Sequence, residues 1–175
     1  MIKLRKFSFS DLKEVMEIER LSFPNRKPFS EDYFGKLYQK YPEGFMVAED
    51  KGKILGYAIG EVQKDCGKII SIAVHPAWRK KEVGKKLANF YLAYFKKKNL
   101  KKIFLHMRKN NLAAISFYKN LGFQILKTIK NYYQNGDDAD LMERKIWGHL
   151  AQWLARCFDI AEVVGSSPSV PTKLN

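Results

Sequence analysis

The chain contains no apolar run of the ~20 residues needed to cross a bilayer, which argues against a membrane-spanning protein. Its N-terminus alternates apolar and basic residues, as in a strand and not as in a signal peptide. Cys66 and Cys157 are too few for a disulfide framework or a zinc site of their own. The chain also lacks the paired strand aromatics of an RNP sequence. We therefore expect a cytoplasmic protein in a reducing compartment, with no membrane partner, no specific nucleic acid and no metal.

Positive charge is plentiful, since the formal net charge of the 175 residues is +14. This charge favours polyanionic partners, such as nucleic acid, the ribosome surface or a phosphate-rich cofactor. It is equally compatible with a lysine-coated surface that has no specific partner. The 46% hydrophobic and 29% charged residues are typical of a folded globular domain, so charge alone does not decide the function.

Alternating strand and helix patterns run to about residue 146 and predict an α/β or α+β domain. Ser10 and Ser30 are expected to cap the first two helices. A third helix, from Val83, has the clearest apolar stripe, and a fourth covers 112–121. The predicted strands are 2–7, 45–48, 54–62, 68–74, 103–107, 123–133 and 139–146.

The composition changes after this domain, because residues 147–175 contain one lysine, Lys173, and a Ser/Pro-rich stretch at 165–169. We expect a domain at 1–146 and an accessory or disordered tail at 147–175. The tail reads either as a translational extension without a selected role or as an amphipathic helix at 147–160 that docks on the domain or on a partner.

A basic turn separates the strand that ends at Val74 from the helix that begins near Val83. The first turn of a helix has unpaired N–H groups and the positive end of the helix dipole, and both attract phosphate. Lysine and arginine side chains around this turn strengthen the attraction. The basic residues are Arg79, Lys80, Lys81, Lys85 and Lys86.

This stretch resembles the acetyl-coenzyme A motif of the GNAT superfamily of N-acetyltransferases, Gln/Arg-x-x-Gly-x-Gly/Ala. Glu82 replaces the first glycine of the motif, where a side chain and a negative charge would oppose a close pyrophosphate. The resemblance implies a mixed, mostly antiparallel sheet flanked by helices, with a V-shaped splay between its fourth and fifth strands. It also implies that acetyl-coenzyme A is the cosubstrate. The implied cofactor-binding residues are Ile72, Ala73, Val74, Arg79, Lys80, Lys81, Glu82, Val83, Gly84, Lys85, Asn111 and Tyr118.

The segment 105–123 resembles the next block of the family, which ends in Asn-x-x-Ala-x-x-x-Tyr-x-x-x-Gly-Phe. Asn111 and Tyr118 are seven residues apart and share one helix face. The resemblance implies that Asn111 contacts the cofactor and that Tyr118 protonates the departing thiolate. His106 lies at the position of the general base and is expected to titrate near neutrality. A purely structural histidine is the alternative.

The segment 130–142 resembles the Tyr-Tyr-x-x-Gly-Glu-Asp-Ala hairpin of protein N-terminal acetyltransferases. The resemblance implies that Tyr132 and Tyr133 bind the substrate backbone from one side, and Phe23 and Pro24 from the other. Two positions depart from the pattern: Asn25, where relatives often carry glutamate, and Lys68, where several have His or Tyr near a catalytic water.

Together these resemblances imply direct transfer of an acetyl group from acetyl-coenzyme A to the N-terminal α-amine of proteins, with a general base and a general acid. One alternative is a GNAT enzyme that acts on lysine, polyamine or a small amine. The other is a weakly catalytic, coenzyme A-binding or ribosome-associated protein, which the basic charge and Glu82 would favour.

Overall fold

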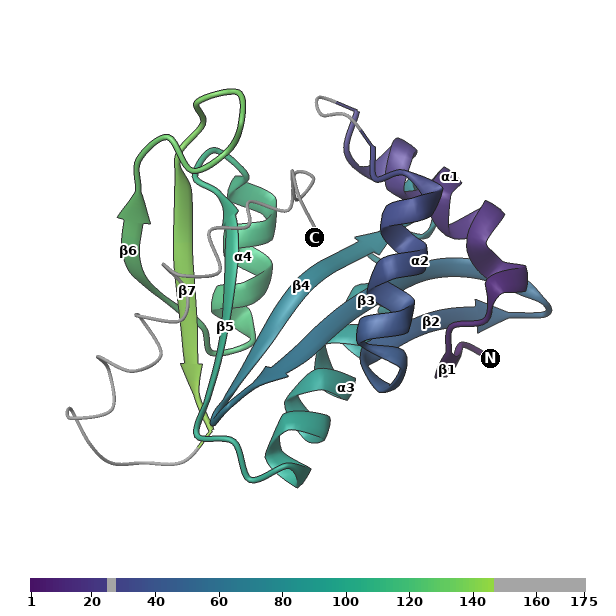
Figure 1. Cartoon of the computed structure of the whole chain (residues 1–175), viewed down its shortest axis with the longest axis horizontal. Coiled ribbons are helices and arrows are strands. Elements are labelled where there is room, and N and C mark those ends of the chain that lie inside the picture. The colour runs from purple at the N-terminus through teal and green to yellow at the C-terminus, as the bar shows by residue number, and fades with distance from the viewer. Residues whose placement is uncertain (25–27, 147–175) are drawn as a thin grey trace. The chain divides into compact units, whose positions relative to one another are not determined.

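The computed structural model describes residues 1–24 and 28–146, which form two compact units (Figure 1). Unit 1 comprises 1–61 and 69–94, and the described part of unit 2 comprises 62–68 and 95–146. The strands follow the order β1-β2-β3-β4-β5-β7-β6 in one seven-stranded sheet. The expected mixed, mostly antiparallel sheet with flanking helices is confirmed.

Unit 1 contains the first four strands and three helices (Figure 1). Its strands are β1 (Lys3–Lys6), β2 (Phe45–Asp50), β3 (Lys53–Gln63) and β4 (Cys66–Val74), of which β3 and β4 continue into unit 2 at one end. Its helices are α1 (Leu12–Ser22), α2 (Glu31–Lys40) and most of α3 (Val83–Lys97).

The helices of unit 1 pack on both faces of its strands. Residues of α1 and α2 share one apolar cluster with Phe45, Tyr57 and Ile59. On the other face, Gly56 lies so close to Val83 and Leu87 of α3 that a methyl group there would meet their side chains within 3.3 Å. Alternate residues of β3 therefore contact opposite helix layers, as strand geometry requires.

Two local predictions about helix ends had different outcomes. Ser30 caps α2 as expected, since its hydroxyl accepts a hydrogen bond from the Tyr33 N–H at 3.2 Å. Ser10 does not cap the first helix. The chain already turns at Phe9–Asp11, where the Asp11 carboxylate accepts the Ser8 N–H at 2.8 Å and pairs with Arg5. The Asp11 side chain makes no capping hydrogen bond to α1. It holds the turn before the helix through its ion pair with Arg5, which local spacing does not reveal.

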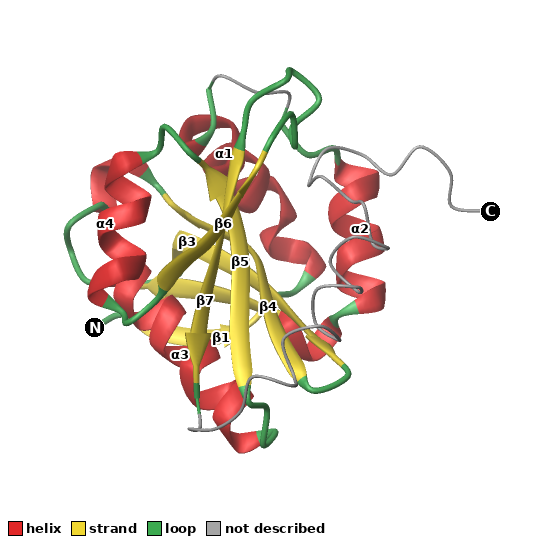
Figure 2. Cartoon of the chain, turned by 90° about the vertical axis from the view of Figure 1, so that its left-hand side faces the viewer, coloured by secondary structure: helices red, strands yellow, loops and turns green. Residues whose placement is uncertain are grey.

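Unit 2 contains β5 (Lys102–Arg108), α4 (Leu112–Asn120), β6 (Gln124–Ile129) and β7 (Ala139–Lys145). β7 pairs antiparallel with both β5 and β6. Helix α4 lies along this group of strands (Figures 1 and 2), and its C-terminal carbonyl at Leu121 accepts a hydrogen bond from Arg144 of β7 at 2.7 Å. Arg108, at the end of β5, pairs with Ala139, at the start of β7. The loop between β6 and β7 therefore lies at the same end of unit 2 as the C-terminal end of β5.

In the part of the chain that the structure describes, no helix has both the length and the apolarity needed to span a membrane. The predicted tail at 147–175 lies outside the described residues, as do Cys157 and Asn25.

Candidate active site

The turn before α3 has a left-handed backbone at Glu82, a conformation that glycine adopts readily, although glycine is missing there. Lys80 and Glu82 both have left-handed φ values, of 60° and 63°. Turns that mix left-handed and right-handed residues point successive N–H groups toward one place, where an anion can bind. The segment therefore suits a pyrophosphate in its backbone geometry.

The charges of this turn are partly engaged within it. Lys85 pairs with Glu82 at 3.2 Å, and both side chains are more than half exposed. The Lys81 ammonium lies 4.7 Å from the centre of the Trp78 ring, and Arg79 donates to the Val74 carbonyl at 3.3 Å. Glu82 thus adds a negative charge and holds one cation, which opposes phosphate binding.

Unit 1 also joins the predicted substrate loop to the predicted thioester-binding strand. The Ser22 hydroxyl, at the end of α1, donates to the Val74 carbonyl at the end of β4 at 3.2 Å. Phe23 and Pro24 follow Ser22 directly, so this hydrogen bond fixes the start of their loop beside the 72–74 strand segment. No sequence pattern marks Ser22 as functional, because a serine in the last turn of a helix is common.

A buried carboxylate that the sequence analysis missed supports the same loop. Glu19 is fully buried, accepts the Tyr57 hydroxyl at 2.5 Å and accepts the Phe29 N–H at 3.4 Å. The Tyr57 hydroxyl also lies 3.4 Å from Ser71 Oγ of β4. The sequence did contain a signal for Glu19, since this glutamate falls on the apolar stripe of the first helix.

In unit 2, His106 lies beneath the first of the paired tyrosines. The rings of His106 and Tyr132 are stacked, with centroids 4.7 Å apart and planes 7° from parallel. Both ring nitrogens of His106 are buried and have no hydrogen-bond partner among the described residues. Buried polar atoms normally have hydrogen-bond partners, so these two nitrogens indicate a site that binds a ligand.

The expectation that His106 titrates near neutrality is wrong for this structure. Burial and, to a smaller extent, the charges of Lys68 and Lys127 lower the pKa of His106 to about 3. His106 is therefore neutral at physiological pH. It can accept a hydrogen bond or a proton, but as a weak base.

Arg108 holds the second paired tyrosine. Its guanidinium carbon lies 4.3 Å from the centre of the Tyr133 ring, and its Nη1 pairs with Asp137 in the same loop. Strand alternation places Arg108 on the same face as His106. Strand alternation predicted this shared face, but no role was predicted for Arg108. The two tyrosines are thus positioned by two side chains of β5.

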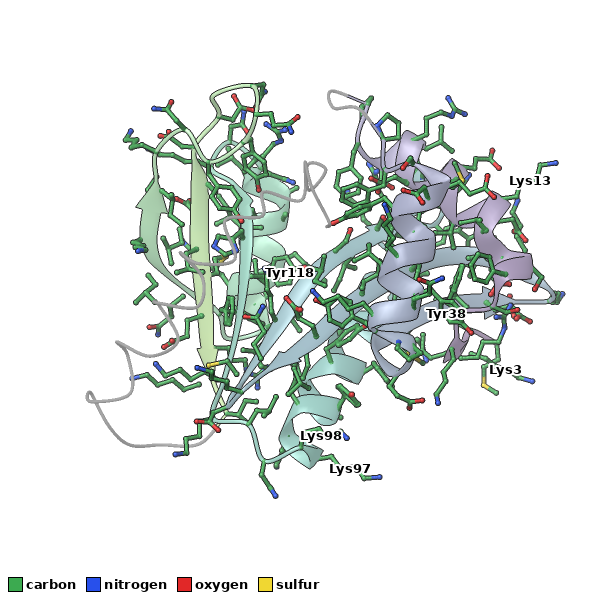
Figure 3. All side chains as sticks on the ribbon, viewed as in Figure 1. Lys3, Lys13, Tyr38, Lys97, Lys98 and Tyr118 are labelled. Carbon is green, nitrogen blue, oxygen red and sulfur yellow. The ribbon has the colours of Figure 1, made fainter. Side chains whose placement is uncertain are left out.

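Tyr118 and Asn111 belong to α4 and its first turn. Tyr118, labelled in Figure 3, is buried against Phe123, with ring centroids 5.4 Å apart. Burial raises its pKa well above the usual value, which keeps the hydroxyl protonated. The Asn111 side chain caps α4 by accepting the Ala114 N–H at 3.1 Å. Its carbonyl oxygen therefore already has a structural role.

Known acetyltransferases are similar to this chain over most of its length. An uncharacterized N-acetyltransferase of Methanocaldococcus jannaschii is 37% identical over 146 residues, covering 81% of this chain and 90% of that protein. An N-alpha-acetyltransferase of Sulfolobus acidocaldarius is 31% identical, covering 80% and 90%. The crystal structure of Ard1 from Thermoplasma volcanium superposes with a TM-score of 0.78 at 28% identity, covering 84% of this chain and 99% of that one. The sequence profile of the acetyltransferase (GNAT) family matches residues 12–123. The chain therefore belongs to the GNAT family of acetyltransferases.

Proposed function

We propose that this protein transfers the acetyl group of acetyl-coenzyme A to the N-terminal α-amine of polypeptides. The observation that carries the proposal is the neutral His106, with two unpartnered ring nitrogens beneath the paired tyrosines of the β6–β7 loop. An extended peptide needs flat side chains and hydrogen-bonding groups beside its backbone, and Tyr132 and Tyr133 supply both. Two relatives described above are acetyltransferases, and one is named for α-amine transfer.

The weak basicity of His106 favours an α-amine over a lysine side chain. An α-amine with a pKa of roughly 7.8 is on the order of one tenth neutral at pH 7, whereas for lysine, at about 10.4, the neutral fraction is nearer 0.04%. Because the pKa of His106 is about 3, its imidazole can take a proton from only a very small fraction of ammonium groups. The acceptor amine must therefore be neutral when it binds. The neutral fraction of a lysine side chain is more than two orders of magnitude smaller than that of an α-amine.

In the proposed reaction, acetyl-coenzyme A supplies an activated acetyl group as a thioester. The 79–85 turn, the N-terminus of α3 and Asn111 would bind its phosphates and pantetheine, with Glu82 weakening the contact. Backbone N–H groups of 72–74 would polarise the acetyl carbonyl. His106 would orient the attacking amine and accept its proton, directly or through water, and Tyr118 would donate a proton to the leaving sulfur.

An assay on the full chain tests the proposal. Peptides with a free α-amine and acetylated lysines are compared with peptides that have a blocked α-amine and free lysines, and with spermidine. We expect mass spectrometry to find new acetyl groups on the first residue only. Acetylation confined to lysine or to spermidine would overturn the proposal in favour of another amine acceptor.

A second arm separates catalysis from binding alone. His106→Ala should lower kcat with acetyl-coenzyme A affinity unchanged, because His106 is not among the residues that would hold the cofactor. Binding of acetyl-coenzyme A without turnover of any amine would instead favour a coenzyme A-binding protein. Association with ribosomes, which the +14 charge favours, stays a prediction that co-sedimentation at rising salt tests.

A further inference from the structure

Glu19 is a fully buried glutamate in the last turn of α1. Its backbone carbonyl accepts the Phe23 N–H at 3.0 Å, and its side chain accepts the Phe29 N–H at 3.4 Å. A single residue of α1 is therefore bonded to the chain on both sides of the predicted substrate residue Pro24.

The carboxylate of Glu19 is also connected to β4 through Tyr57 of β3. It accepts the Tyr57 hydroxyl at 2.5 Å, and the same hydroxyl lies 3.4 Å from Ser71 Oγ. Since the hydroxyl of Tyr57 gives its one proton to Glu19, Ser71 is the donor in the second contact. Tyr57 and Ser71 are buried, where hydrogen bonds to a charged group are strong. Ser71 directly precedes the 72–74 segment that is predicted to bind the thioester.

A second connection joins α1 to the other end of this segment. The Ser22 hydroxyl donates to the Val74 carbonyl at 3.2 Å. Helix α1 thus holds β4 at Ser71 and at Val74, on either side of Ile72 and Ala73. The two connections have no side chain in common, so each can be removed without the other.

We propose that Glu19 is a positioning residue for acetyl transfer, which acts through Tyr57 and Ser71 to align the acceptor amine beside Phe23 with the thioester on β4. The inference rests on the proposed function, because it takes Phe23 to bind the acceptor and 72–74 to bind the thioester. Glu19 is buried and would touch neither substrate. A displacement of about 1 Å between reacting groups can cost about a hundredfold in rate, so such a connection affects turnover without substrate contact.

Two variants of the full chain test this role. Glu19→Gln keeps the size of the side chain and removes its charge, whereas Tyr57→Phe removes only the hydroxyl. In each we expect kcat/KM for a peptide with a free α-amine to fall about tenfold. The Kd of acetyl-coenzyme A, measured by calorimetry, should stay within about twofold. Tyr57→Phe keeps the test decisive where Glu19→Gln fails to fold.

Asp11→Asn is the matched control. Asp11 is another buried carboxylate of unit 1, and its partners are Arg5 and the Ser8 N–H. Its loss should lower the stability to urea, as the loss of Glu19 does, but should leave kcat/KM for the peptide within about twofold. Rates are compared at a temperature at which urea unfolding shows every variant to be fully folded.

Double variants show whether the residues act through one connection. Glu19→Gln with Tyr57→Phe should be about as slow as the slower single variant, because both changes break the same connection. Ser22→Ala should lower kcat/KM by threefold or more, and its effect should multiply with that of Glu19→Gln, because Ser22 holds β4 through a separate bond.

Three results would overturn the inference and leave α-amine transfer standing. The first is a folded Glu19→Gln variant with kcat/KM within twofold of the wild-type value. The second is an equal loss in Asp11→Asn, which would show that lower stability alone slows the reaction. The third is weaker acetyl-coenzyme A binding in Glu19→Gln, which would assign the residue to the cofactor. Failure of the wild-type protein to acetylate any peptide would instead defeat the proposed function itself.

Discussion

At the scale of single residues, His106 couples stability to pH. A histidine in an unfolded chain has a pKa of about 6.5, whereas His106 in the folded chain has a pKa of about 3. The unfolded state therefore binds the proton first as the pH falls. The contribution of His106 to stability is complete above about pH 6.5 and is lost as the pH falls toward 3.

Replacing His106 by Phe should flatten this pH dependence. Between pH 6 and pH 4 we expect the wild-type protein to lose up to ~1.4 kcal/mol of unfolding free energy per pH unit more than His106→Phe, since one proton separates the two states. Urea unfolding at three pH values measures the difference. Parallel curves for the two proteins would show that His106 is accessible to protons in the folded state.

Glu82 is a second residue whose effect is local. A non-glycine residue at its φ of 63° costs roughly 1–2 kcal/mol, and its carboxylate opposes phosphate. Glu82→Gly should therefore stabilise the fold by about 1 kcal/mol and tighten acetyl-coenzyme A binding. Calorimetry and urea unfolding measure the two effects. Glu82→Ala is the control, because it removes the charge and keeps the strained backbone. Unchanged or weaker affinity in Glu82→Gly would contradict the assignment of this turn.

At the scale of elements, β5 and β7 are joined by a nearly buried ion pair between Lys102 and Glu143, at 3.0 Å. Removing one partner of such a pair leaves the other charge buried without compensation, which costs about 3–5 kcal/mol. Lys102→Met should therefore be strongly destabilising, whereas Lys102→Met with Glu143→Leu should recover most of the loss. A double-mutant cycle by urea unfolding checks this. A loss below about 1 kcal/mol in Lys102→Met would mean that water reaches Glu143.

Helices and strands also position the loop residues of the site within each unit. In unit 1, Ser22 holds the start of the loop that contains Phe23 by its hydrogen bond to β4. Glu19 holds the end of the same loop by accepting the Phe29 N–H. In unit 2, His106 and Arg108 of one strand each contact one of the paired tyrosines. In both units a regular element positions a loop, which gives rigid support to residues that must bind a substrate.

At the scale of the whole molecule, the predicted boundary near residue 146 can be tested by truncation. A chain that ends after Trp147 should keep its melting temperature within a few degrees and its turnover within about twofold, because β7 ends at Lys145 and the family profile ends at residue 123. Thermal unfolding and the peptide assay compare it with the full chain. A fall of 10 °C or more would show that the tail is part of the fold.

The sequence by itself determined the order of strands and helices along the chain, the Ser30 cap and the family motifs at 105–123 and 130–142. These depend on local periodicity and spacing, which are complete within short stretches of chain. Tertiary structure alone decided the rest. The turn at Asp11 depends on Arg5, the role of Glu19 depends on Tyr57, and the neutrality of His106 depends on burial and on lysines from two other strands. A pKa or a buried hydrogen bond is set by neighbours distant in sequence, and only folding brings them together.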